Sequence, residues 1–141
     1  SDPMIDTTTK FGQRVACRLA EERIAWLTTI DSNGIPQPRP IWFLWDGETF
    51  LIYSRPGTAK LRHIVERPQV SLNLDGDGLG GDIVVFTGQA AIDPAAPPAH
   101  QVPAYTAKYQ PGFDRIGMTA AEFAASYSVA VRVTPLKLRG H

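Results

Sequence analysis

Hydroxyl groups and positive charges gather in one short stretch of the chain, "YSRPGTAKLRH". An apolar run ends there at Ser54 and Arg55, and a short helix is predicted to begin at Thr58, with Lys60 near its start. The hydroxyls, the close backbone approach that Gly57 allows and the free N–H groups of a helix start together favour binding of a phosphate. In a chain whose net charge is zero, this local excess of cations predicts an anionic ligand.

The same stretch has a plainer explanation, a capped helix start whose cations are simply solvated. The upstream segment "RPIWF", Arg39 to Phe43, favours the interpretation as a phosphate-binding site over this explanation. A neighbouring strand of this composition would supply an aromatic and apolar wall beside the cations.

A second candidate motif, "DGDGLGGD", contains glycines at the spacing of a dinucleotide fingerprint, namely Gly76, Gly78 and Gly81. That fingerprint requires a helix after the glycines, whereas here a strand is predicted on each side. The aspartates of this stretch lack the terminal glutamate of a calcium loop, so they are interpreted as a solvated turn. No metal site is expected.

Other catalytic groups give no positive signal. His63, His100 and His141 are scattered, and no serine or cysteine lies in a nucleophile-elbow sequence. His63 is expected to be a hydrogen-bonded or surface histidine, and the lone Cys17 a half-buried structural thiol. The three tryptophans are expected to pack in the core. The catalytic residues therefore stay unassigned.

Composition limits the function classes. The chain has 141 residues, of which 43% are hydrophobic and 20% charged, as expected of one globular domain spanning residues 4–141. Residues 1–3 resemble the remnant of a cleaved tag. Balanced charge argues against nucleic-acid binding, no apolar run is long enough for a membrane span, and a single cysteine fits the reducing cytoplasm.

Hydrophobic periodicity predicts a mainly β fold with peripheral helices. Three prolines in "IPQPRPIWFLW" confine the first half of that strand to a sheet edge or a bulge, so only Ile41 to Trp45 is expected to pair fully. The predicted strands are 24–30, 41–45, 48–55, 69–75, 82–92 and 128–140, and the predicted helices are 10–23, 58–67, 104–109 and 120–127. Six strands joined mainly by hairpins favour a small antiparallel barrel.

From Glu22 onward the sequence resembles the split β-barrel flavin and deazaflavin proteins related to pyridoxamine 5′-phosphate oxidase. Within that group it is most similar to the actinobacterial branch that uses coenzyme F420. The resemblance is carried by "ERIAWLTTIDSNGIPQPRPIWFLWDGETFLIYSRPGTAKLRHIVERPQVSLNLDGD", by "GDIVVFTGQA" and by the closing "VAVRVTPLKLRG". It implies a six-stranded antiparallel split β-barrel of the FMN-binding type.

The resemblance also implies where the cofactor phosphate would lie. By motif position it would contact Ser54, Arg55, Thr58 and Lys60, and Arg62 is near enough to help.

The tricyclic ring of the cofactor would lie along the strand Arg39, Pro40, Ile41 and Trp42, whose backbone amides would hold the ring edge. A second subunit would close the other side of the site, so the resemblance implies a homodimer.

Three functions remain open. The first is a coenzyme F420-dependent reductase that transfers a hydride to a small unsaturated molecule, and the second is an FMN-dependent oxidoreductase of the same fold. The third is a non-catalytic carrier of a flavin, deazaflavin or haem. Vitamin B6 oxidation is not expected, because "LKLRGH" offers Arg139 and His141 without the surrounding pattern of the oxidases. The Pro-rich segment 94–112 is expected to border the pocket.

Overall fold

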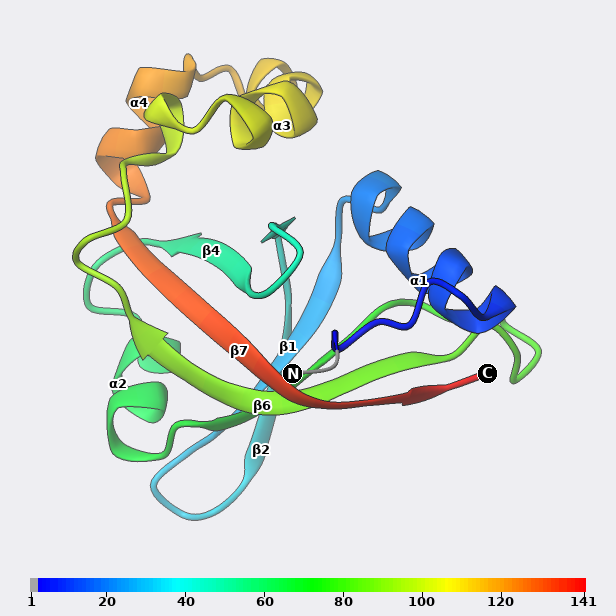
Figure 1. Ribbon diagram of the computed structural model, residues 1–141. Coiled ribbons are helices and arrows are strands. Elements are labelled where there is room, and N and C mark those ends of the chain that lie inside the picture. The colour runs from blue at the N-terminus through cyan, green and yellow to red at the C-terminus, as the bar shows by residue number, and fades with distance from the viewer. Residues whose placement is uncertain (1–2) are drawn as a thin grey trace.

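The computed structural model describes residues 3–141, so the predicted tag remnant lies outside the described residues except for Pro3 (Figure 1). The strands are β1 (Ala25–Ile30), β2 (Pro36–Ile41), β3 (Leu44–Trp45), β4 (Phe50–Ser54), β5 (Gln69–Asn73), β6 (Val84–Ile92) and β7 (Val129–Gly140). The helices are α1 (Lys10–Glu21), α2 (Ala59–Glu66), α3 (Pro103–Ile116) and α4 (Ala120–Ser126), with a 3-10 turn η1 (Ala99–Gln101) before α3.

The strands form one antiparallel sheet in the order β2-β1-β5-β6-β7-β4-β3. Its two edge strands, β2 and β3, are consecutive in the chain and are joined by only Trp42 and Phe43. Two residues span at most about 7 Å, so the sheet must curl until its edges approach each other. This arrangement is the predicted split barrel, with peripheral helices.

The strand count is seven where six were predicted, because the chain turns at Trp42 and Phe43. The expected strand from Ile41 to Trp45 is therefore wrong. The first, proline-containing half of the predicted strand is β2, and it pairs with β1 along its whole length, from Ala25↔Ile41 to Ile30↔Pro36. This is possible because β2 is an edge strand, as predicted, and the prolines occupy alternate positions that need not donate to β1.

Two hydrophobic cores lie on opposite faces of β4, which is buried at every position. Phe50 and Ile52 point into the barrel interior, where α1 and α2 also contribute buried residues. Leu51 and Tyr53 point the other way, into a second core formed with η1, α3 and α4. We refer to η1, α3 and α4 together as the helical cap.

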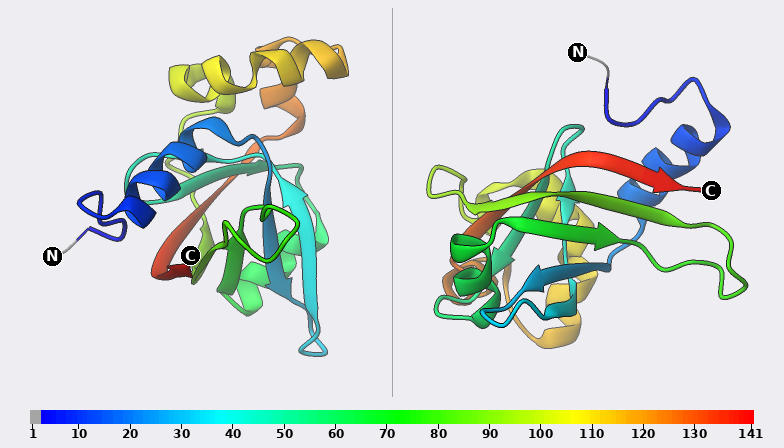
Figure 2. Two further views of the ribbon diagram at one scale, coloured as in Figure 1. Left: turned by 90° about the vertical axis from the view of Figure 1, so that its right-hand side faces the viewer. Right: turned by 90° about the horizontal axis from the view of Figure 1, so that it is seen from below.

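The helical cap forms a separate layer beside β4, and α2 packs lower down against β1 and β6 (Figures 1 and 2). Helix α3 is longer than the predicted helix 104–109, and it ends at Gly117 in a left-handed conformation. Helix α4 begins with the predicted Thr119 cap, which forms a reciprocal capping box with Glu122.

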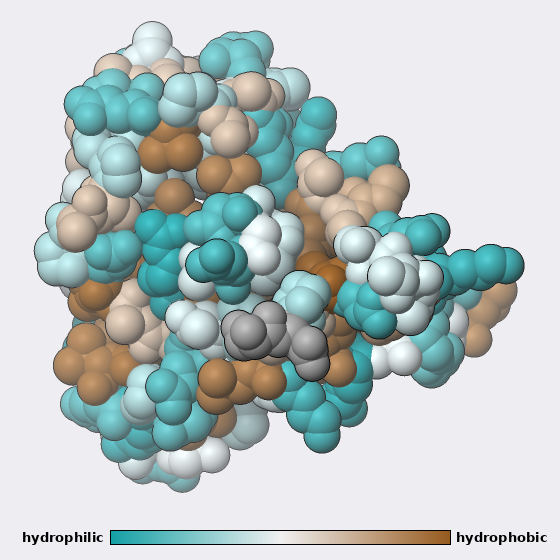
Figure 3. Space-filling model, viewed as in Figure 1, coloured by the Kyte–Doolittle hydropathy of each residue, from teal (hydrophilic) through white to brown (hydrophobic). Residues whose placement is uncertain are grey.

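The surface is mixed in character. Figure 3 shows hydrophobic side chains scattered between hydrophilic ones on the face of the molecule seen in Figure 1. Within residues 3–141, every helix is too short or too polar to cross a lipid bilayer.

Candidate functional site

A pocket of about 320 Å³ lies where the end of β2, helix α2 and the helical cap meet. Four of its wall residues, Pro40, Ile41, Trp42 and Lys60, belong to the predicted site. The remaining wall residues are Ile24, Tyr53, Tyr105, Ile116, Phe123 and Tyr127. The structure thus places the strand "RPIWF" and the start of α2 around one space, although they are about twenty residues apart in the sequence.

Lys60, in the pocket wall, has a second cation near it, Arg39, which is not itself a wall residue. Burial lowers the pKa of the Lys60 ammonium, and the nearby guanidinium of Arg39 lowers it further. Burial also lowers the pKa of Arg39, and its Nε is buried without a hydrogen-bond partner among the described residues. Both residues are half-buried, and a cation that is partly removed from water without a partner is costly, so the two charges favour an anionic ligand. Arg39, which was predicted only to line the ring as part of the strand, therefore also belongs with the cations that could bind a phosphate.

The hydroxyl groups of the predicted phosphate cradle lie together. Ser54 Oγ donates to the carbonyl of Arg55 at 2.8 Å and lies 3.1 Å from Thr58 Oγ1. The Thr58 side chain is turned toward Ser54 and makes no capping hydrogen bond to the first turn of α2. The N–H groups of that turn are therefore not occupied by this side chain, as a phosphate site at the helix start requires.

The other two predicted cations have internal roles. The guanidinium of Arg55 lies 5.1 Å from the centre of the Tyr127 ring, which places it at the rim of the pocket rather than in its wall. Arg62 donates from Nη1 to the carbonyl of Gly57 at 2.9 Å and so braces the turn before α2. Arg55 and Arg62 are both exposed to solvent. Lys60 and Arg39 are consequently better placed for a buried anion.

The register of β2 limits which amides can hold a ring. Pro40 has no N–H, so its pair with Trp26 cannot be a doubly hydrogen-bonded one, and the amides of Arg39 and Ile41 must point toward β1. Arg39 and Ile41 therefore use their amides in the sheet, and Pro40 has no amide to offer a ring edge. Trp42 follows Ile41, the last residue of β2 that pairs with β1. Of the four residues predicted to line the ring, it is therefore the one whose amide is free to face the pocket.

The helical cap supplies the residues that sequence reasoning missed. The Trp42 ring stacks on Tyr109 at 4.7 Å between ring centres and on Phe123 at 5.4 Å. Helix α3 can come this close because Gly112 faces the indole, where a β-carbon would lie 2.8 Å from the ring. The prediction that segment 94–112 borders the pocket is confirmed by Tyr105, but the wall continues to Tyr127.

Polar contacts fix the helical cap to the barrel. The Tyr109 hydroxyl accepts from the Phe43 amide at 2.7 Å and lies within 2.9 Å of the carbonyls of Phe43 and Arg23. Lys108 Nζ donates to the carbonyls of Phe43 at 2.9 Å and Leu19 at 3.3 Å. Burial lowers the pKa of Lys108 to about 8. These bonds satisfy backbone groups at the end of α1 and at the β2–β3 bend, and so define the position of the pocket's aromatic wall.

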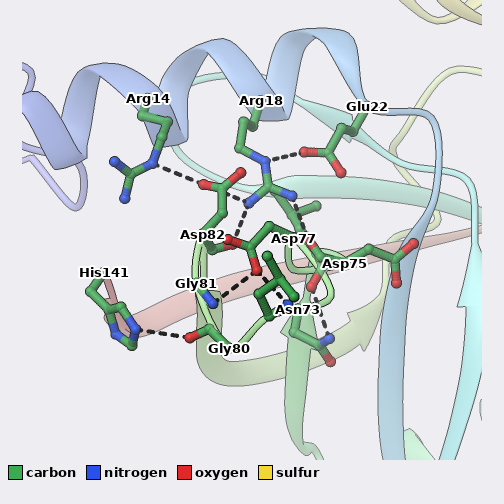
Figure 4. Close-up of polar contacts among 12 residues, drawn as sticks. Arg14, Arg18, Glu22, Asn73, Asp75, Asp77, Gly80, Gly81, Asp82 and His141 are labelled. Carbon is green, nitrogen blue, oxygen red and sulfur yellow. Dashed lines mark hydrogen bonds and ion pairs between the residues drawn. The ribbon is translucent and has the colours of Figure 1, made fainter.

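The glycine loop is a separate structure, shown in Figure 4. It joins strands β5 and β6, as predicted, and no helix follows it. Asp77 Oδ1 accepts from the amides of Leu79 at 2.7 Å and Gly81 at 3.0 Å. An internal carboxylate therefore occupies the amides that a phosphate would need.

Asp82 departs from the predicted solvated turn, since its carboxylate lies 2.9 Å from Arg14 Nε and 3.3 Å from Arg18 Nη1 (Figure 4). These ion pairs tie the loop to α1.

The remaining candidates lie away from the pocket wall. His63 is hydrogen-bonded as predicted, with Nδ1 2.8 Å from Thr29 Oγ1. His141 lies 3.1 Å from the carbonyl of Gly80, and Arg139 pairs with Val85 in the sheet. Cys17 is exposed, so the prediction of a half-buried thiol is wrong. No group of residues in 3–141 has the geometry of a metal site.

Comparison with known proteins identifies the family. The sequence matches pyridoxamine 5′-phosphate oxidase over residues 11–141. The chain belongs to this family. The match extends over nearly the whole molecule and confirms the relationship that the sequence motifs indicated. No curated protein matches the chain.

Solved structures with the same fold name different bound groups in their descriptions. An F420 reductase is 23% identical, with a TM-score of 0.61 over 86% of this chain and 93% of that one. An FAD-binding protein from Mesorhizobium loti is 17% identical, with a TM-score of 0.63 over 89% and 87% of the chains. HutZ, the haem storage protein from Vibrio cholerae, is 14% identical, with a TM-score of 0.65 over 94% and 95%. At these identities the likeness establishes the fold alone.

Proposed function

We propose that the protein is a reductase that uses coenzyme F420 and transfers a hydride between this deazaflavin and a small unsaturated molecule. The observation that carries the proposal is the pair Lys60 and Arg39. Neither cation forms an ion pair with a residue of the described part of the chain; Lys60 lines a pocket that also has aromatic wall residues, and Arg39 lies close enough to Lys60 to lower its pKa. The similarity in fold to an F420 reductase supports the same proposal.

The residues fit a phosphorylated ring cofactor. Lys60 and Arg39 would hold the phosphate with the hydroxyl of Thr58 at the start of α2, while Ser54, which is fully buried and bonded to Arg55 and Thr58, would orient that hydroxyl. The strand from Pro40 to Trp42 would lie along the ring. The pocket volume, about 320 Å³, is at the lower end of the range for ligand sites, so it suits a ring system and leaves an acidic tail outside. Arg55 and Arg62, exposed at the rim, are the cations available to such a tail.

When bound, a reduced deazaflavin supplies a hydride and reacts poorly with oxygen. The protein's own task is then to hold the acceptor against the ring and to exclude water from the contact. Trp42, Phe123 and Tyr127 suit this task, since their rings pack against one another in the pocket wall. None of these side chains would act as a covalent catalyst.

The proposal includes a homodimer in the cytoplasm, with the second copy closing the exposed side of the site. Pro40 and Arg55 are both exposed in the single chain, although each belongs to the predicted cofactor surface. A neighbouring subunit is the simplest group that could cover them. Membership of the actinobacterial branch is also part of this proposal.

Two experiments test the assignment. The absorbance of the purified protein distinguishes a co-purified yellow flavin, which would favour the FMN-dependent alternative, from a colourless protein that can be loaded with coenzyme F420. Fluorescence titration with coenzyme F420 and, separately, with FMN then measures both affinities. Saturable binding of coenzyme F420 that exceeds that of FMN is expected. Binding of haem in preference to both would favour the carrier function, and binding of none would contradict all three.

A further inference from the structure

Helix α3 contains a buried glycine, Gly112, at a position where the helix alone would favour another residue. A glycine in the interior of a helix is less stable than an alanine, because its backbone loses more freedom on folding. Gly112 also follows Pro111, which lacks the N–H that the helix would use at that position. Two unfavourable residues in succession indicate a requirement from outside the helix.

That requirement is the contact between Gly112 and Trp42. A β-carbon at Gly112 would lie 2.8 Å from Cη2 and 2.9 Å from Cζ2 of the indole. Real β-carbons do not come this close to another heavy atom, so one of the two groups would have to move. An alanine at this position would therefore displace either helix α3 or the indole.

Helix α3 is not free to move away from the indole. Lys108 and Tyr109 lie about one turn before Gly112 in the same helix. Both side chains bond to the backbone of Phe43, at distances between 2.7 and 2.9 Å. Phe43 directly follows Trp42 in the chain, so these bonds couple the helix to the segment that carries the indole. A methyl group added at Gly112 must consequently be accommodated by the Trp42 side chain.

The surroundings of the indole determine where it could go. Three rings pack around Trp42, with ring-centre distances of 4.7 Å to Tyr109, 5.4 Å to Phe123 and 5.9 Å to Phe113. Closely packed rings leave little room for a further shift among them. The empty space beside this cluster is the pocket, because Trp42 forms part of its wall. A displaced indole would therefore enter the pocket.

We propose that Gly112 is a positioning residue, whose missing side chain sets the place of the Trp42 indole and thereby the width of the pocket for a planar ring. Gly112 acts through Trp42 and is not itself a wall residue. This inference rests on the proposed function, which assigns the pocket to the cofactor ring. The pocket volume of about 320 Å³ is small for a ligand site, so a displaced indole would exclude part of the ring.

Titration with lumiflavin tests the ring pocket alone, since this compound has the tricyclic ring of FMN but a methyl group in place of the phosphorylated side chain. Gly112→Ala should bind lumiflavin roughly five- to thirtyfold more weakly than the wild type, as expected for one extra methyl group in a packed site. In a Trp42→Phe background the same substitution should change the affinity by less than about twofold, because the shorter ring leaves room for the methyl group. Equal affinities of Gly112→Ala and wild type, or an equal loss in both backgrounds, would overturn the inference.

NMR of the indole N–H groups measures the displacement in the ligand-free protein. The Trp42 signal is assigned by its absence from the spectrum of Trp42→Phe. Gly112→Ala should shift this signal and leave those of Trp26 and Trp45 in place. An unshifted Trp42 signal would overturn the inference.

Gly117→Ala is the matched control for a general loss of stability. Gly117 follows the same helix with φ of +69°, and among residues 3–141 no atom beyond its chain neighbours lies within 4 Å of the place of its β-carbon. The control should lower the Tm through backbone strain and still bind lumiflavin within about twofold of wild type. A comparable loss of lumiflavin affinity in Gly117→Ala and Gly112→Ala would overturn the inference. Failure of Gly112→Ala to fold would also overturn it, because the indole would then not yield into the pocket.

Cofactor titration separates this inference from the proposed function. Gly112→Ala should lose affinity for coenzyme F420 and for FMN by about the same factor as for lumiflavin, because the ring contact changes and the phosphate contact does not. If the wild type binds lumiflavin in the expected way but neither cofactor, the proposed function fails and the positioning role stands. If the variant binds lumiflavin and both cofactors as the wild type does, the positioning role fails and the proposed function stands. Binding of none of the three by the wild type would overturn both.

Discussion

Replacement of Lys60 by methionine tests the proposed phosphate contact. Methionine keeps an unbranched side chain of similar length and removes the charge that burial and Arg39 disfavour. If Lys60 holds a phosphate through a charge-assisted hydrogen bond, the variant should lose on the order of 1.5–3 kcal/mol of binding free energy. This loss is a roughly ten- to hundredfold rise in the dissociation constant. Because the ammonium has no ion pair with a described residue, the Tm should stay the same or rise slightly.

The assay is fluorescence titration of wild type and Lys60→Met with coenzyme F420 and with FMN, at low and at high salt. The affinity difference should shrink as salt increases, since screening weakens the contribution of the charge. Lys137→Met is the matched control, because Lys137 is an exposed lysine on β7 that does not line the pocket. It should leave both affinities within about twofold. Equal affinities of Lys60→Met and wild type would refute the phosphate contact.

Three further predictions concern the assembly, the glycine loop and pH. Light scattering after size exclusion should give twice the mass of the chain, and a strict monomer at micromolar concentration would count against the shared site. Gly78→Ala should lower the free energy of unfolding by about 1–2 kcal/mol, because φ is +82° at this position. The cofactor affinity of this variant should stay within a few fold of wild type, and a hundredfold loss would show that the loop binds the cofactor. Burial lowers the pKa of Lys108 from 10.5 to about 8, so in this window the unfolded chain binds more protons and the free energy of unfolding should rise with pH. Urea unfolding of wild type and Lys108→Met should be measured at pH 8 and at pH 10. The free energy of unfolding should increase less between these pH values in the variant than in the wild type, and an equal increase in the two proteins would contradict the prediction.

Local sequence signals predicted the start of α2 and every strand except the one expected from Ile41 to Trp45. The Asn33-Gly34 pair indicated the first hairpin, and Thr119 indicated the start of α4. Such signals act through turn conformation and capping bonds, which depend on a few adjacent residues. The bend at Trp42 had no such signal, because it depends on the distant Tyr109, whose hydroxyl bonds to the Phe43 amide.

The cationic part of the site was predictable because its residues lie within one turn and one helix start. The aromatic wall was not. Tyr105, Phe123 and Tyr127 belong to the predicted helices 104–109 and 120–127, but the sequence does not indicate where these helices pack on the sheet. They meet Trp42 only because the helical cap folds back over β4. Arg39 was assigned to the ring strand alone, since its approach to Lys60 follows from the curl of the sheet.

The central claim is that this pocket binds a phosphorylated deazaflavin. The most direct measurement is titration of coenzyme F420 fluorescence with the wild-type protein, alongside the same titration with FMN. We expect saturable binding of coenzyme F420 at one site per chain, tighter than that of FMN and weakened by salt. Failure of the wild type to bind coenzyme F420 at micromolar concentrations would contradict it.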